Sequence, residues 1–293
     1  MEINDVSDIE LLLKKGDYIP DEKISTSIFL AFKLNKPVLI EGPPGTGKTS
    51  IALSVAKALN RKLIRIQVYE GITEERIIGE WNYQKQILNI ELYRNEFDKK
   101  DLEKNIFSED FFIYRPLLTS FLSKDDVVLL IDEIDKSDFE FESFLLESLG
   151  EKQITIPELG TFKLKNNALI FLTSNVEREL SEPLKRRCLY LHLDFPTKER
   201  EEEIVKLHVP DASDHLIKKV VSIVHEIRRF DLRKLPSISE TFEWIQSLLM
   251  LTKNEIKELD PDLIINTLSV ILKYQEDIKK VKPKIQEILE KNK

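Results

Sequence analysis

The stretch from Gly42 to Thr49 has the residue types and spacing of a loop that binds phosphate groups. It reads GPPGTGKT and matches G-x-x-x-x-G-K-[ST], in which glycines let successive backbone N–H groups point toward one anion. Lys48 can reach the β- and γ-phosphates of a nucleotide, and the Thr49 hydroxyl can ligate Mg²⁺. The alternative is a glycine-rich turn that caps a helix. The apolar run before the loop and the helical pattern after it favour phosphate binding.

This interpretation predicts ATP and Mg²⁺ as cofactors. The predicted nucleotide-binding residues are Gly42, Pro43, Pro44, Gly45, Thr46, Gly47, Lys48, Thr49 and Ser50.

Two carboxylates follow a second apolar run, VVLLID, and complement the phosphate loop. Asp132 ends that run and can hold Mg²⁺ through water, so Thr49 and Asp132 are the predicted metal-binding residues. Glu133 is next in the chain and can polarise an attacking water as a general base. An acidic exit from a strand is common by itself, but the phosphate loop favours the catalytic interpretation. Asp135 and Asp138 are interpreted as solvated loop or helix-cap residues.

Asn175 is a third candidate, at the end of the run ALIFLTSN. Its amide could orient the water between Glu133 and the γ-phosphate. The alternative is a turn residue that leaves a strand. The functional interpretation is favoured because ligands of open α/β sheets bind at the carboxyl ends of strands.

The elements that must position these residues alternate along the first two thirds of the chain. Apolar or alternating runs predict strands at 37–41, 63–68, 126–132, 168–175 and 189–193, and helical spacing predicts helices at 21–34, 48–59 and 139–149. This alternation predicts an α/β fold, a P-loop αβα sandwich with a parallel sheet. From Lys198 onward the periodicity is helical. We therefore expect a nucleotide-binding domain at 1–196 and a small all-α lid domain at 197–293.

Composition limits the function classes. The chain has 293 residues, and 52 acidic against 44 basic residues give a net charge of −8, which disfavours wrapping of duplex nucleic acid. One cysteine, Cys188, excludes an intramolecular disulfide framework. The N-terminus lacks the apolar segment of a signal peptide, and no run approaches the roughly 18 apolar residues of a membrane span. These features predict a cytoplasmic protein without a membrane span.

The motifs GPPGTGKT, LLIDEID, FLTSN and LKRRC, in this order, resemble those of AAA+ ATPases. Four longer stretches are similar to the MoxR family, in the subgroup of the carbon-monoxide-dehydrogenase accessory ATPase CoxD. They read VYEGITEERIIGEWNYQKQIL, IPELGTFKLKNNALIFLTSN, ERELSEPLKRRCLYLHLDFP and LRKLPSISETFEWIQSL. The resemblance extends from about residue 19 to residue 249.

The resemblance implies a homo-oligomeric ring, usually a hexamer, in which one subunit contributes an arginine to its neighbour's nucleotide. Arg186 and Arg187 are both candidates for this arginine finger, and Arg187 is preferred. The alternative is a solvated pair, or ion pairs with Glu179 or Glu182 of the same subunit.

The resemblance to the family leads to expectations for three further regions. The helical lid often carries an arginine where this chain has Ser239-Glu240, so Arg233 is a possible substitute. Trp81 and Tyr83 lie where the family inserts extra structure, and either local packing or contact with a pore or partner is open for them. Residues 157–162 resemble a hairpin with Gly160 at its turn.

The resemblance implies an ATP-driven, chaperone-like machine that matures or activates protein or metalloenzyme complexes, with a client protein and a von Willebrand factor A (VWA) domain partner. One alternative is a nucleic-acid-directed motor, such as a helicase, a loader or a restriction-type NTPase. Another is a non-enzymatic nucleotide-binding scaffold, against which the intact set of candidate residues argues.

Overall fold

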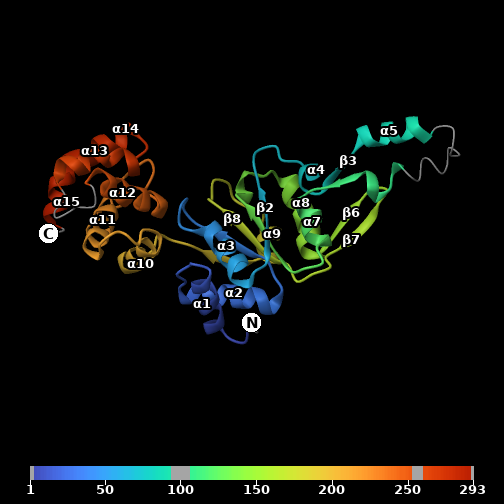
Figure 1. Ribbon diagram of the computed structural model, residues 1–293, viewed down its shortest axis with the longest axis horizontal. Coiled ribbons are helices and arrows are strands. Elements are labelled where there is room, and N and C mark those ends of the chain that lie inside the picture. Colours follow the sequence, from blue (N-terminus) through green and yellow to red (C-terminus); the bar gives the residue numbers. More distant parts are fainter. Residues whose placement is uncertain (1–2, 94–105, 253–259, 292–293) are drawn as a thin grey trace. The chain divides into compact units, whose positions relative to one another are not determined.

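The computed structural model describes residues 3–93, 106–252 and 260–291 (Figure 1). The chain divides into two compact units. The first comprises the N-terminal residues up to Gly16 together with residues 20–42 and 48–192, and the second comprises residues 17–19, 43–47 and 193–293. The expected domains at 1–196 and 197–293 stay a prediction about folding units.

A five-stranded parallel sheet is the centre of the first unit, with strand order β2-β5-β8-β1-β9. Its strands are β1 (Val38–Glu41), β2 (Lys62–Gln67), β5 (Val127–Asp132), β8 (Leu169–Ser174) and β9 (Leu189–His192). The five predicted strands are thus confirmed within one or two residues at each end. Every residue of β1, β5 and β8 is buried, as expected for parallel strands covered on both faces.

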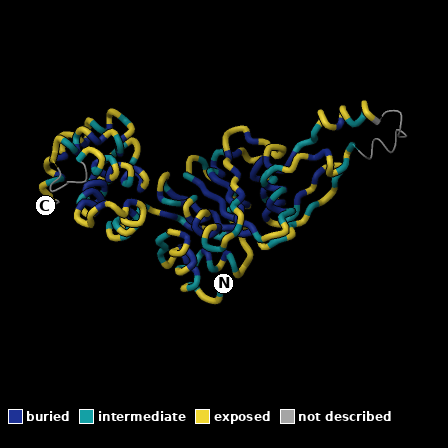
Figure 2. Tube along the Cα trace, in the orientation of Figure 1, coloured by how far each residue is buried: buried dark blue, intermediate teal, exposed yellow. Residues whose placement is uncertain are grey.

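Helices cover both faces of this sheet. Successive residues of a strand point to opposite faces, so each face is covered by a different set of helices. Leu129 and Ile131 of β5 belong to a core shared with α7 (Pro116–Leu122), α8 (Phe139–Gly150) and α9 (Glu182–Arg187). Val128 and Leu130 are equally buried but point to the other side of β5, and α3 (Lys48–Leu59) contacts this strand. The remaining helices of this layer are α1 (Val6–Lys15) and α2 (Glu22–Leu34), which contact each other. In Figure 2 the strands are dark blue between helices with exposed outer surfaces.

Two small antiparallel pairs extend the first unit. One joins β3 (Gly79–Trp81) to β4 (Phe112–Tyr114), and the other joins β6 (Gln153–Ile156) to β7 (Gly160–Lys163). Ile156 faces Gly160, whose φ of 92° is left-handed, so the predicted hairpin with Gly160 at its turn is confirmed. The short helices of this part are α4 (Glu74–Ile77), α5 (Tyr83–Tyr93) and two 3₁₀ turns, η1 (Glu109–Phe111) and η2 (Ile134–Lys136). Helix α5 lies beyond β3, away from the large sheet (Figure 1).

The second unit is helical from residue 198 to 291, apart from its connecting loops and the undescribed residues 253–259. Its elements are α10 (Lys198–His208), α11 (Asp214–Ile227), α12 (Ile238–Leu251), α13 (Pro261–Ile271), α14 (Gln275–Val281), η3 (Lys282–Lys284) and α15 (Ile285–Lys291). They enclose a separate apolar core around Trp244, whose indole N–H donates to Thr267 Oγ1 at 2.8 Å. The α/β fold followed by a helical region is the predicted fold class.

Candidate functional site

The phosphate loop connects β1 to α3, as its motif predicts. Gly45 and Gly47 have φ values of 75° and 90°, a region that side chains with a Cβ rarely occupy. Lys48 begins α3 and is only 6% exposed, and its Nζ donates to the Gly42 carbonyl at 2.6 Å. Burial lowers the pKa of Lys48 to about 8, and the charges of Asp135, Asp132 and Glu133 partly offset this. A nucleotide phosphate would supply the negative charge that favours the protonated amine.

Thr49 and Asp132, the predicted metal-binding pair, lie in direct contact. The Thr49 hydroxyl donates to Asp132 Oδ1 at 3.1 Å. Asp132 also accepts hydrogen bonds from the Thr173 hydroxyl and the Arg65 guanidinium, and its side chain is 4% exposed. A hydroxyl and a carboxylate at this spacing fit Mg²⁺, which takes oxygen ligands and usually completes its shell with water and substrate phosphates.

Glu133 follows β5 in a left-handed conformation with a φ of 59°. Its backbone N–H donates to Thr173 Oγ1 at 3.0 Å. Its carboxylate accepts from Gln67 Nε2 at 2.8 Å and from Lys136 Nζ at 2.6 Å. The side chain is about one third exposed, so it is both held by neighbours and open to water. Its general-base role stays a prediction.

Asn175 directly follows β8, whose last residue contacts Gly42, the residue after β1. Strand β8 pairs with β1, and the Gly42 N–H donates to the Ser174 carbonyl at 3.3 Å. Because β8 also pairs with β5, the ends of all three strands bring Asn175, Glu133 and Gly42 to one edge of the sheet. The proposed role of Asn175 in orienting water is untested.

The interpretation of Asp135 as a solvated residue was wrong. Asp135 is 3% exposed, and its Oδ2 accepts backbone hydrogen bonds from Asn175 and Glu177, each at 3.0 Å. The left-handed Glu133 and the η2 turn direct Asp135 inward. Asp138, in contrast, caps α8 by accepting from the Phe141 N–H at 2.8 Å, as expected.

Sequence reasoning missed four residues that contact the candidate carboxylates: Arg65, Gln67, Lys136 and Thr173. Arg65 and Gln67 belong to β2, which pairs with β5 so that Gln67 lies opposite Asp132. The signal in the sequence was that the predicted strand at 63–68 carries polar residues toward its end, as the strand that ends at Asp132 does. Thr173 lies in the same TSN run as Asn175, within the strand predicted at 168–175.

The two candidate finger residues occupy the last turn of α9. The Arg186 side chain is 82% exposed and lies 3.8 Å from Glu182, the weak pairing considered as an alternative. Arg187 is exposed and packs beside Gly150, and it forms no hydrogen bond or ion pair with the described residues. Neither arginine contacts the described Lys48, Asp132 or Glu133 of its own chain, so their catalytic role stays a prediction.

Trp81 and Tyr83, the two candidate residues of the region expected as an insert at 69–88, have different surroundings. Trp81 is partly buried and makes edge-to-face contacts with Phe107 and Phe112, with centroids 5.3 and 5.2 Å apart, which supports local packing. Tyr83 is 67% exposed. Contact with a partner stays open for this residue.

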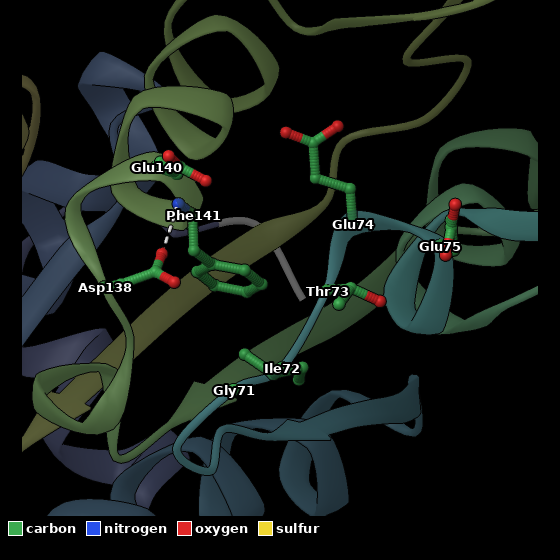
Figure 3. Close-up of a pocket in the computed structure, with 8 residues that line it drawn as sticks. All are labelled: Gly71, Ile72, Thr73, Glu74, Glu75, Asp138, Glu140 and Phe141. Atoms are coloured by element: carbon green, nitrogen blue, oxygen red, sulfur yellow. Dashed lines mark hydrogen bonds between the residues drawn. The ribbon is translucent and has the colours of Figure 1, made fainter.

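A pocket of about 350 Å³ lies between the start of this region and α8 (Figure 3). None of the residues that line it belongs to the candidate site: Gly71, Ile72, Thr73, Glu74, Glu75, Asp138, Glu140 and Phe141. Burial raises the pKa of Glu74, and the charges of Glu147, Glu140 and Glu75 raise it further.

Within the second unit, residues 43–47 of the loop lie against the start of α12. The Ile238 N–H donates to the Gly45 carbonyl at 3.3 Å, and a Cβ on Gly45 would lie 2.2 Å from that of Ser237. Ser237 and Glu240 form a capping box that closes this helix N-terminus. The Arg233 guanidinium lies 4.2 Å from the ring centre of Tyr274, so its use as a lid sensor stays a hypothesis.

Cys188 is a packing residue at the junction of α9 and β9. Burial raises the pKa of its thiol to about 12, against the weaker effect of Lys36. In the part of the chain that the structure describes, no three His, Cys, Asp or Glu side chains gather as a metal cluster. Among the same residues, no helix has the length and apolar character needed to cross a bilayer.

The parallel sheet with a phosphate loop after β1 defines a P-loop nucleotide-binding fold. The family described as AAA domain (dynein-related subfamily) matches residues 37–188, more than half of the chain, and the chain belongs to this family. Among solved structures, the match to a point mutant of RuvB from Thermotoga maritima covers 92% of this chain and 71% of that chain, with a TM-score of 0.52. At 17% identity this likeness shows the fold alone.

Curated relatives include proteins named gas vesicle ATPases. GvpN of Haloferax mediterranei is 27% identical over 205 residues, which are 67% of this chain and 57% of the relative. GvpN2 of Halobacterium salinarum is 26% identical over 234 residues, 73% of this chain and 66% of the relative. The chain therefore spans less than two thirds of the length of these relatives.

Proposed function

We propose that the chain hydrolyses ATP with Mg²⁺. The observation that carries this proposal is the contact of the Thr49 hydroxyl with Asp132 at 3.1 Å, directly after the buried Lys48 of the phosphate loop. Lys48 would neutralise phosphate charge, and Thr49 and Asp132 would hold the metal. When bound, Mg²⁺ neutralises phosphate oxygens and orients the nucleotide. Relatives named as ATPases support the same activity.

Glu133 would accept a proton from the attacking water, and Asn175 would orient that water. Both follow adjacent strands of the sheet, so their backbones are fixed by the β5–β8 pairing. Gln67 and Lys136 hold the Glu133 carboxylate and thereby restrict where its oxygens point. Apart from this proton transfer, hydrolysis by the site would depend on positioning and charge stabilisation, as in other P-loop enzymes.

The proposed assembly is a homo-oligomeric ring, as AAA family members usually form, with six subunits as the expected number. In such a ring Arg187 or Arg186 would reach the nucleotide of the neighbouring subunit. Their exposure and their place at the end of α9 support this, since neither arginine contacts the described site residues of its own chain.

We further infer a MoxR-type remodelling role, in the CoxD-like subgroup, for maturation or activation of a protein or metalloenzyme complex. A client protein and a VWA-domain protein are the proposed partners. This inference rests on the four sequence stretches quoted above and on analogy. A nucleic-acid-directed motor is less favoured because the chain carries a net charge of −8.

The direct test compares Glu133→Gln with wild type for ATP binding and hydrolysis. We expect unchanged nucleotide affinity and a rate lower by about 10²–10⁴-fold, the usual contribution of a general base. Lys48→Ala should lose nucleotide binding. The matched control is Glu140→Gln, the same change at an exposed residue of α8. Hydrolysis at the wild-type rate by Glu133→Gln would remove Glu133 from this role, and a wild type that binds no ATP would refute the proposed activity.

A further inference from the structure

The turn after β8 has a conformation that its own residues do not favour. Val176 has a φ of 63°, the left-handed region, although it is β-branched and 53% exposed. Such residues are genuine outliers there because their branched Cβ crowds the backbone. Strained residues of this kind persist only where the surrounding structure fixes them.

Asp135, which follows a different strand, holds the backbone on both sides of Val176. One carboxylate oxygen, Oδ2, accepts the N–H groups of Asn175 and Glu177, the residues on either side of Val176, each at 3.0 Å. The Val176 N–H donates to Ser174 Oγ, also at 3.0 Å. Three successive N–H groups are therefore held by side chains, and two of them by a single buried carboxylate. We call residues 175–177 the clamped turn.

The same carboxylate connects the two candidate catalytic residues. Asp135 lies two residues after Glu133, and it holds the backbone of Asn175. In the opposite direction, the Glu133 N–H donates to Thr173 Oγ1 at 3.0 Å, two residues before Asn175. The turn after β5 is thus bonded to Thr173 of β8, and the turn after β8 is bonded to Asp135, which follows β5. Together these bonds fix the distance between the two turns.

The surroundings of Asp135 favour strong hydrogen bonds to its carboxylate. The side chain is buried, and its second oxygen, Oδ1, accepts no hydrogen bond from the described residues. Of the charges that act on Lys48, that of Asp135 has the largest effect. A charged carboxylate accepts hydrogen bonds more strongly than a neutral amide in such a site.

We propose that Asp135 is a positioning residue that holds Asn175 at the carboxyl end of β8 by keeping the clamped turn in its strained conformation. The inference rests on the proposed ATP hydrolysis. It assigns the placement of Asn175 to a side chain of the β5 segment, in addition to the strand that carries Asn175.

The test measures kcat, KM and nucleotide affinity for Asp135→Asn, together with amide hydrogen exchange of residues 173–178. Asparagine keeps the shape and one carbonyl acceptor but loses the charge. We expect kcat to fall about tenfold or more, since small misplacements of positioning groups cost such factors, with KM and affinity within twofold of wild type. The amides of Asn175 and Glu177 should exchange faster. The control Asp138→Asn keeps an equally good helix cap and should leave kcat unchanged.

Rescue separates positioning from general support of the fold. Val176→Gly removes the steric cost of the left-handed conformation. The double variant Asp135→Asn/Val176→Gly should therefore have a kcat at least threefold higher than that of Asp135→Asn alone. A merely structural Asp135 would lower stability without this recovery. Should Asp135→Asn fail to fold, Val176→Pro tests the same turn at an exposed position. Proline cannot adopt the left-handed φ and lacks the N–H, so a tenfold lower kcat is expected.

The outcomes distinguish this inference from the function on which it rests. An active wild type with Asp135→Asn or Val176→Pro within twofold of its kcat overturns the positioning role and leaves the ATPase proposal intact. A fall in kcat that Val176→Gly does not relieve also overturns it. Absence of hydrolysis by wild type overturns both proposals.

Discussion

At the scale of single residues, the site depends on side chains that each serve two partners. Thr173 is the clearest case, because its buried hydroxyl donates to Asp132 and accepts from the Glu133 N–H. It thus orients the predicted metal ligand and the backbone of the predicted base together. A hydroxyl is the smallest group that can both donate and accept.

Thr173→Val keeps the shape of the side chain but removes the hydroxyl. It should lower the free energy of unfolding by about 1–3 kcal/mol, because the buried Asp132 carboxylate and the part-buried Glu133 N–H each lose a hydrogen bond. It should also reduce kcat more than it changes nucleotide affinity. Urea unfolding and steady-state kinetics measure the two effects. Thr173→Ser should keep most of both, and Thr155→Val on the exposed hairpin should change neither; equal kcat for Thr173→Val and wild type would contradict the assignment.

At the scale of elements, one buried carboxylate joins three helices of the second unit. Glu201 of α10 accepts from Arg228 at 2.5 and 2.9 Å, contacts His225 Nε2 at 2.8 Å and accepts from Thr241 at 3.0 Å. Burial, the largest influence, raises the pKa of Glu201, but the hydrogen bonds from His225 and Arg228 and their charges outweigh it and hold the pKa below its usual value.

This lowered pKa predicts acid-sensitive packing of α10–α12. A carboxyl with a depressed folded-state pKa contributes stability above its unfolded value, near 4.3, and loses the contribution as pH falls through the folded value. Unfolding followed by Trp244 fluorescence, in a Trp81→Phe background, should therefore show falling stability below about pH 4.5.

Glu201→Gln tests this contribution at neutral pH. It should cost about 3–5 kcal/mol at pH 7, because the Arg228 side chain, 7% exposed, keeps a buried charge without its partner. It should also flatten the acid dependence. Glu203→Gln, at an exposed position of the same helix, is the control. If Glu201→Gln left the acid dependence of stability unchanged, that dependence would have to come from other groups.

At the scale of the whole molecule, the predicted ring requires that one subunit complete the next one's site. Wild-type specific ATPase activity should then rise with protein concentration as subunits assemble. Mass measured in solution with and without ATP gives the assembly in parallel. A constant rate from a stable monomer would rule out a finger supplied by a neighbour.

Mixing inactive variants identifies the finger. Lys48→Ala subunits keep the arginines but bind no nucleotide, and Arg187→Ala subunits bind nucleotide without the finger, so mixtures should recover part of an activity that a finger raises by about 10³–10⁵-fold. The same mixture with Arg186→Ala distinguishes the two arginines. Lack of recovery at all mixing ratios for both would leave them as surface charges.

Most of the large sheet could be predicted because its strands are apolar or alternating runs between turn residues. The runs at 126–132 and 168–175 coincide with β5 and β8 within one residue at each end. The pairing of β3 with β4 could not be predicted, since Trp81 and Phe112 are far apart in sequence and each strand has three residues. Short strands carry little periodicity.

The phosphate loop can be recognised from the amino-acid sequence alone, because its function depends on backbone conformation and on residues at fixed spacing within eight positions. The acidic end of β5 can be recognised in the same way, because it follows from local pattern. Two features become visible only in the folded chain. Asp135 turns inward to hold Asn175, and Arg65, Gln67 and Thr173 contact Asp132 or Glu133. These contacts join residues about 40 to 67 positions apart, and their geometry depends on strand order and on left-handed turns. No local pattern encodes such distances, because strand pairing fixes them only when the chain has folded.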